Sequence, residues 1–239
     1  MILAGIMAIG TTNAQEDKYI FNHVAIGAEV GTTGIGLELA APLTHYVTFR
    51  TGFTTMPSFS FKDDMDYMLN DNRNEVKVKG TTNISDFKLL ADLYPFKNCS
   101  FHLTGGFYAG RPNLVELKNT EPIVGNMTPG TDGVMIGEEL VPTDANGIVH
   151  ANLKVKSFKP YVGLGFGRAV SKHRVNVAFD MGLQFWGTPK VEALWPAENA
   201  WRKVNTSDEP GDDINKVLDK VSKVKIYPVL SLRVYCRIL

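Results

Sequence analysis

Long stretches of this 239-residue chain alternate apolar and polar residues one by one, and this alternation constrains the fold more than any other feature. In residues 175–185, VNVAFDMGLQF, every odd position is a large hydrophobic residue and every even position is polar or small. Successive side chains of a β-strand point to opposite faces, so this segment has one apolar face and one polar face. The same period recurs in residues 44–53, 85–93, 101–108, 157–166 and 224–234. The sequence therefore predicts an antiparallel protein with many strands.

The hydrophobic parity also locates a tight turn. Val24, Ile26 and Val30 hold one parity and Ile35 and Leu37 hold the other, with the switch at Gly31-Thr32-Thr33-Gly34. The resulting eight strands run over about 22–31, 34–42, 45–60, 82–94, 100–110, 151–167, 173–186 and 222–237. An even count brings both chain ends to the same rim. Alternatively, residues 24–41 form one bulged strand, and a further strand lies within residues 111–150.

The polar face carries charges, which bears on whether the apolar face meets a ligand cavity or lipid. An oily ligand cavity has no use for charges, whereas a narrow lumen can pair them with one another. Glu38 and Arg50 flank the turn at residues 42–45 and are predicted as cross-strand partners. An ordinary solvated sheet face is the alternative. Five acids and six bases form the predicted lumen charge network: Glu29, Glu38, Arg50, Asp86, Lys88, Asp92, Lys159, Arg174, Asp180, Lys225 and Arg233.

Short and long connections alternate along the chain. The short ones cover residues 41–45, 95–100 and 169–173, and the long ones cover about 62–82, 111–150 and 187–219. Outer-membrane barrels have short periplasmic turns and long external loops. The long segments are rich in Gly, Pro, Asn and Asp, which favours turns over packed elements. The sequence therefore predicts a transmembrane barrel with three large external loops.

Aromatic residues lie near both ends of the predicted strands, as in the girdles of membrane barrels. In a soluble sandwich the same rings would belong to the core. The rings near the short turns are Tyr46, Tyr94, Phe96, Phe101 and Tyr227, and those near the long loops are Phe59, Phe61, Phe185 and Trp186.

The N-terminus predicts a signal peptide over residues 1–14, followed by one barrel domain over residues 15–239. Residues 2–9 are apolar, and Thr12 and Ala14 suit cleavage before Gln15, although no basic segment precedes the apolar run. A buried first helix is the alternative. No other apolar run reaches the roughly 18 residues of a membrane helix. The formal net charge is zero, which argues against a nucleic-acid partner.

Three segments carry a family resemblance. They are LLADLYPF at 89–96, PYVGLGFG at 160–167, and FDMG at 179–182 with GTPKV at 187–191. Across most of residues 23–235 the chain resembles small outer-membrane β-barrel proteins of Gram-negative bacteria, similar in kind to the OmpX/Ail, OmpW and PagL barrels. The resemblance implies insertion by the barrel-assembly machinery. The chain departs from these barrels after Tyr235, because its last residue is not aromatic.

The search for catalytic chemistry yields no site. The glycines of residues 163–167 resemble part of a dinucleotide loop, but no helical pattern follows, and glycines facing a crowded lumen explain them better. The five histidines are dispersed and form no recognisable triad. We therefore predict no catalytic residue, no cofactor and no metal ligand, and a protein that is not an enzyme.

The predicted function follows from the predicted fold. An eight-stranded barrel has an interior just wide enough for side chains or one small ligand. We expect an integral barrel of the cell outer membrane with a side-chain-filled lumen and a structural or surface-interaction role for its loops. Its expected partners are outer-membrane lipid, lipopolysaccharide and a host or surface ligand. One alternative is an OmpW-like channel for small hydrophobic molecules, for which Leu90, Tyr108 and Tyr161 are the only hints; the other is a soluble lipocalin-like ligand carrier.

Overall fold

Eight antiparallel strands close into a barrel in the computed structural model, which describes residues 23–69, 72–82, 84–96, 99–123, 133–136, 139–170, 173–204 and 225–238. The first and last strands pair, with Ala25 opposite Arg237, so the prediction of eight strands is confirmed. The predicted signal peptide, residues 1–14, lies outside the described residues. Around the barrel the strands are β1 (Ala25–Gly31), β16 (Ile226–Arg237), β13 (Val175–Phe185), β12 (Phe158–Phe166), β7 (Phe101–Gly110), β6 (Ser85–Leu93), β3 (Val47–Thr55) and β2 (Gly34–Pro42).

The predicted turn between β1 and β2 is present. Gly31 pairs with Gly34, and Gly34 has a φ of 101°, a conformation that costs a glycine little. Two predicted strands were too long, because the barrel strand β3 ends at Thr55 and β12 begins only at Phe158.

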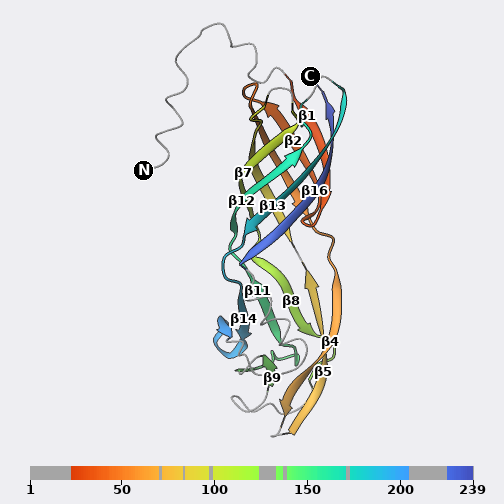
Figure 1. Ribbon diagram of the computed structural model, residues 1–239. Helices are drawn as coiled ribbons and strands as arrows, with labels where there is room; N and C mark the ends of the chain where they lie inside the picture. Colours follow the sequence, from red (N-terminus) through yellow and green to blue (C-terminus); the bar gives the residue numbers. More distant parts are fainter. Residues whose placement is uncertain are drawn as a thin grey trace, which may run out of the picture.

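The long connections form a second sheet of eight strands beyond one rim of the barrel (Figure 1). Its order is β10 (Glu139–Val141), β9 (Gly133–Ile136), β4 (Ser60–Leu69), β5 (Asn72–Thr82), β8 (Asn113–Asn119), β11 (His150–Lys154), β14 (Lys190–Trp195) and β15 (Ala200–Val204). A short 3-10 turn, Pro196–Glu198, joins the last two. The expectation of turn-rich loops was therefore wrong, since these segments have hydrogen-bonding partners in one another.

This outer sheet packs around a hydrophobic core of its own. Val78 and Leu117 come from β5 and β8, and they meet Val134 of β9 and Val191 of β14. Strands that look marginal as separate segments of the sequence become stable together, because three or more strands with a shared apolar face can form a stable unit. The described parts of the three long connections therefore form a single packed sheet.

The alternation on the barrel strands places the hydrophobic face outward. Leu37, Phe53 and Val177 are more than half exposed, while the intervening residues point into the lumen and are buried. Such an outward apolar band with a polar interior is the arrangement of transmembrane barrels. No helix of the described residues is long and apolar enough to cross a membrane.

Exposed aromatic rings mark both ends of the apolar band. Tyr46, Phe96 and Phe166 lie at the end with the short turns, and Phe59 and Phe158 lie at the end facing the outer sheet. Three predicted girdle rings are elsewhere, because nearness to a turn does not determine which way a ring points. Tyr94 is buried in the lumen, and Trp186 and Tyr227 stack on one another at the rim beneath the outer sheet, 4.4 Å between ring centroids.

Candidate functional site

Most of the predicted charge network lies inside the barrel lumen. Nine of the eleven residues are buried there: Glu29, Glu38, Arg50, Asp86, Lys88, Asp92, Lys159, Asp180 and Arg233. The other two, Arg174 and Lys225, are exposed and lie one residue before β13 and β16 respectively. The alternation assigned Arg174 and Lys225 to the inner face. Beyond the end of a strand, however, the alternation no longer predicts which face a side chain occupies. The lumen charge network therefore consists of the nine buried residues and does not include Arg174 and Lys225.

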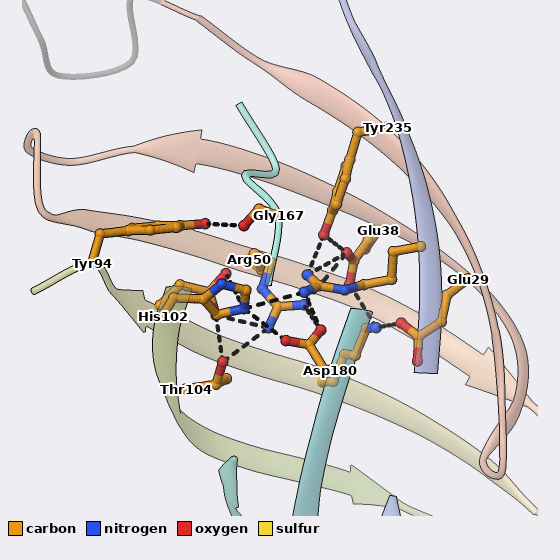
Figure 2. A network of polar contacts seen from close by, with 12 residues as sticks. Glu29, Glu38, Arg50, Tyr94, His102, Thr104, Gly167, Asp180 and Tyr235 are labelled. Atoms are coloured by element: carbon orange, nitrogen blue, oxygen red, sulfur yellow. Dashed lines mark hydrogen bonds and ion pairs between the residues drawn. The ribbon is translucent and has the colours of Figure 1, made fainter. Parts of the chain in front are cut away.

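Arg50 lies at the centre of the network and faces three carboxylates (Figure 2). Its Nη2 is 2.8 Å from Asp92 Oδ1, and its Nη1 is 3.5 Å from Glu38 Oε1 and 3.6 Å from Asp180 Oδ2. The guanidinium is 1% exposed. The predicted pairing of Glu38 with Arg50 is present, although Arg50 lies directly opposite Ala40 and reaches Glu38 on the diagonal.

A second arginine extends the same network. Arg233 pairs with Asp180, and its Nη1 lies 3.4 Å from Glu38 Oε1. The Arg233 guanidinium also donates a hydrogen bond of 2.5 Å to the Tyr235 hydroxyl, which in turn donates to Glu38. Glu38 and Asp180 therefore each contact both arginines.

Lysines connect the network toward the outer rim. Lys88 pairs with Glu29, and its Nζ is 2.6 Å from Glu38 Oε2. One level further out, Lys159 donates to both oxygens of Asp86 at 2.7 and 2.9 Å. Each lysine is buried, so these pairs are desolvated, and removing one member would leave an uncompensated buried charge.

His102 belongs to the network although the sequence reasoning did not assign it. Its Nε2 is 2.7 Å from Asp180 Oδ1, and its Nδ1 is 3.3 Å from the Ser100 carbonyl. Nε2 also lies 3.4 Å from Nη2 of Arg233, so His102 contacts both members of the Arg233–Asp180 pair. The available signal was the parity of residues 101–108, which puts His102 and Thr104 on the polar face.

The buried charges of the network nearly balance. Outside the separate Lys159–Asp86 pair, four buried carboxylates (Glu29, Glu38, Asp92 and Asp180) face three permanent cations (Arg50, Lys88 and Arg233). This near balance matters because an unbalanced charge in a low-dielectric interior is costly.

Glycines make room for the large side chains of the lumen. A Cβ on Gly163 or Gly182 would lie 2.5 Å from the Tyr161 hydroxyl oxygen, and one on Gly165 would lie 2.3 Å from Asp180 Oδ1. Gly163 and Gly165 both point into the lumen. The glycines of residues 163–167 are thus explained by packing, as expected from the sequence.

An apolar layer and an aromatic pair complete the filling of the barrel. Leu90, Tyr108, Tyr161 and Val229 form a buried cluster beside the network, with Leu90 opposite Arg50 and Tyr108 opposite Lys88. Nearer the outer sheet, the Trp186 indole donates a 2.5 Å hydrogen bond to Gln184 Oε1. The three residues that hinted at an apolar passage therefore do meet, but as packed side chains.

Local ion pairs lie on the exposed surface of the outer sheet. Lys154 Nζ is 2.7 Å from Glu192 Oε2, and His150 Nε2 is 3.2 Å from Asp144 Oδ2. Within the described part of the chain, no cluster of three or more His, Cys, Asp or Glu side chains could hold a metal ion. Cys99 and Cys236 are both exposed free thiols.

Comparisons with known proteins add the fold relationship. No protein-family model and no curated protein matches this sequence. The crystal structure of Acinetobacter baumannii CarO2 is similar with a TM-score of 0.50 and 24% identity, over 91% of this chain and 99% of that one. Acinetobacter baumannii CarO matches with a TM-score of 0.48 and 21% identity, over 89% and 96% of the two chains. A major outer membrane protein from Thermus thermophilus matches with a TM-score of 0.32 and 15% identity, over 90% and 98%.

The fold shared with CarO2 agrees with the outward apolar band of the barrel. The chain has the fold of a closed eight-stranded β-barrel, with the outward apolar band of a transmembrane barrel.

Proposed function

We propose that the protein is a closed barrel that anchors the outer sheet at the cell surface, and that this sheet, rather than the lumen, carries the interactions of the protein. The observation that supports this proposal is the lumen charge network. Arg50 and Arg233, the two largest side chains in it, are each 1% exposed and contact carboxylates from several strands. A solute crossing the barrel would have to separate these pairs.

The outer sheet supports the second half of the proposal. Its hydrophobic core includes residues from all three long connections, such as Val78, Leu117 and Val191. A packed sheet presents its outer side chains in fixed positions, so a partner that binds it has less conformational entropy to remove than with flexible loops. The proposal assigns no catalysis to the chain, and kinship with the OmpX/Ail, OmpW and PagL barrels stays a prediction.

The rival function is a channel for small hydrophobic molecules. The cluster of Leu90, Tyr108, Tyr161 and Val229 is the observation that favours it. However, Lys159 and Lys88 are the register partners of Tyr108 on the two neighbouring strands, and they form buried ion pairs with Asp86 and Glu29 respectively. A hydrophobic solute would have to pass two desolvated ion pairs. The apolar cluster is therefore better explained as filling of the lumen than as the lining of a channel.

Reconstitution in planar bilayers and liposomes tests the closed barrel. We expect the wild-type protein to give no steady ion conductance and no uptake of a small sugar or a small hydrophobic dye above empty liposomes. A large open porin, reconstituted in parallel, shows that the assay detects a pore. Steady conductance or dye uptake by the folded wild-type protein would overturn the proposal and favour the channel.

Replacing the outer sheet tests the surface role. A variant in which residues 57–83, 112–156 and 187–224 are replaced by short turns keeps every barrel strand. We expect it to insert and to keep its heat-modifiable gel mobility, while bacteria that carry it change in cell–cell aggregation and in sensitivity to detergent. Identical phenotypes of cells with the intact and the shortened protein would contradict the surface role.

A further inference from the structure

Three lysines and a histidine lie in one row across the outer sheet. Lys62 of β4 is directly opposite Lys79 of β5, Lys79 is opposite Lys118 of β8, and Lys118 is opposite His150 of β11. We call the three lysines the cation row. All three are exposed, on the face opposite the core residues Val78 and Leu117.

This arrangement is unfavourable unless something compensates it. Side chains directly opposite on neighbouring strands have Cβ atoms about 5 Å apart, and like charges in that position destabilise a sheet. Among the described side chains, none of the three lysines forms an ion pair. An anion bound along the row would relieve this repulsion.

The carboxylates around the row are few or already engaged. Asp144 contacts His150 and also accepts hydrogen bonds from two backbone N–H groups, and Glu192 pairs with Lys154. Glu116 precedes Lys118 by two residues on β8, and Asp64 follows Lys62 by two residues on β4, so each occupies a neighbouring row. The register thus places three lysines in one row and acidic residues only in the rows beside it.

The position of the row relates it to the membrane. Phe59, which is 62% exposed, exchanges hydrogen bonds with Thr82 at the start of the outer sheet. Lys62 and Lys79 each lie three residues further along their strands, or about 10 Å beyond this aromatic ring. At that level, the molecules packed around an outer-membrane barrel present the phosphorylated sugars of their headgroups.

The neighbouring row on the membrane side supplies hydrogen-bonding groups of the right kind. Ser60 and Thr81 lie opposite each other, with their hydroxyl oxygens 3.4 Å apart. Cations beside hydroxyl groups can bind both the phosphate and the sugar hydroxyls of one headgroup. We propose that the cation row, together with Ser60 and Thr81, binds the phosphate groups of lipopolysaccharide in the surrounding leaflet; this inference rests on the surface role proposed above.

Titration of the folded protein in detergent with fluorescent rough lipopolysaccharide tests the proposal. The row variant carries Lys62→Gln, Lys79→Gln and Lys118→Gln, and a control variant carries Lys190→Gln, Lys203→Gln and Lys225→Gln, which removes the same charge from exposed sites elsewhere. Each basic residue near an anionic membrane surface contributes about fivefold to binding, so the row variant should lose on the order of 100-fold in affinity. The control variant should stay within a few fold of the wild type.

Two further arms identify the group that is bound. Dephosphorylated lipopolysaccharide should bind the wild type and the row variant equally weakly. Inorganic phosphate at millimolar concentration should not displace the intact lipid. Equal affinities of the two variants, unchanged binding of the dephosphorylated lipid, or displacement by inorganic phosphate would each overturn the proposal. None of these results depends on conductance or on cell aggregation, so failure of this inference is distinguishable from failure of the proposed function.

Discussion

The barrel and the outer sheet are built from the same alternating strands, yet their interiors are filled with opposite chemistry. The barrel encloses ionised groups such as Arg50 and Asp92, and the outer sheet encloses aliphatic groups such as Val78 and Leu117. The difference follows from what surrounds each part. Lipid accepts the apolar face of a barrel strand, so the polar face turns inward, whereas water beyond the membrane reverses the preference. Alternation alone therefore predicts a strand, but it does not predict which of the two faces of the strand is buried.

The largest expected effect concerns the charged interior. Arg50→Met removes the cation that contacts Glu38, Asp92 and Asp180, and leaves buried carboxylates without their central partner. We expect the free energy of unfolding in detergent to fall by about 3–5 kcal/mol. Urea titration followed by gel mobility without boiling measures this change.

The matched control for Arg50 is an exposed ion pair of the outer sheet. Arg202 pairs with Glu198, and both side chains are about half exposed. Arg202→Met should cost less than about 1 kcal/mol, since water screens such pairs. Equal losses for the two arginines would mean that burial does not distinguish the two regions.

The next effect concerns the apolar interior. Leu117→Ala should destabilise the outer sheet by about 3 kcal/mol, because it enlarges an already imperfectly filled space between Val78, Val134 and Ala151. The loss should stay local. Amide exchange should accelerate in β5, β8 and β11 while the barrel keeps its gel mobility. Lys118→Ala, the next residue on the opposite face, should change stability by no more than about 0.5 kcal/mol; unfolding of the whole barrel by Leu117→Ala would show that the two interiors are not independent.

A smaller effect tests how tightly the lumen is packed. Gly182→Ala would put a Cβ 2.5 Å from both the Tyr161 hydroxyl oxygen and the Val162 carbonyl oxygen. We expect a loss of about 1–3 kcal/mol in unfolding free energy. Gly105→Ala is the control, because a Cβ there meets no atom within 4 Å. A neutral Gly182→Ala would indicate free space in the lumen and would revive the channel hypothesis.

The smallest effect is a pH dependence confined to the outer sheet. Burial alone would raise the pKa of Asp144, but hydrogen bonds from the Ile148 N–H, from His150 and from the Asn146 N–H outweigh it and lower that pKa below the ordinary 3.8. A carboxyl group with a lowered pKa stabilises the fold above its ordinary pKa, and the contribution is lost as the pH falls through the folded value. Amide protection of Ile148 should therefore decline below about pH 4, by less than about 1 kcal/mol. Asp144→Asn should remove this pH dependence, and an unchanged acid profile in that variant would exclude Asp144 as its source.

The sequence predicted the barrel well, for a physical reason. Every barrel strand is amphipathic, so strand positions, the turn at Gly31–Gly34 and the burial of residues such as Arg50 and Asp180 follow from parity alone. Arg174 and Lys225 were misassigned because parity has no meaning outside a strand. Tyr94 and Trp186, each one residue beyond its strand, were misassigned because nearness to a turn does not determine the direction of a side chain.

The outer sheet and the role of His102 could not be predicted in the same way. The outer strands take partners from other connections, so each looks like a loop when the chain is read locally. β4 and β5, for example, lie between β9 and β8. Parity puts His102 on the polar face of its strand, but its contact with Asp180 depends on a strand 78 residues further along the chain.

The interleaving of the outer strands has a consequence for proteolysis. The hairpin β4–β5 is hydrogen-bonded on both sides to strands of the next long connection, and that connection is bonded in turn to β14. A protease that cuts one connection at the cell surface therefore releases no fragment. The severed ends stay attached through neighbouring strands and through the barrel, so a nicked molecule keeps its shape, and the cleavage becomes visible only after denaturation.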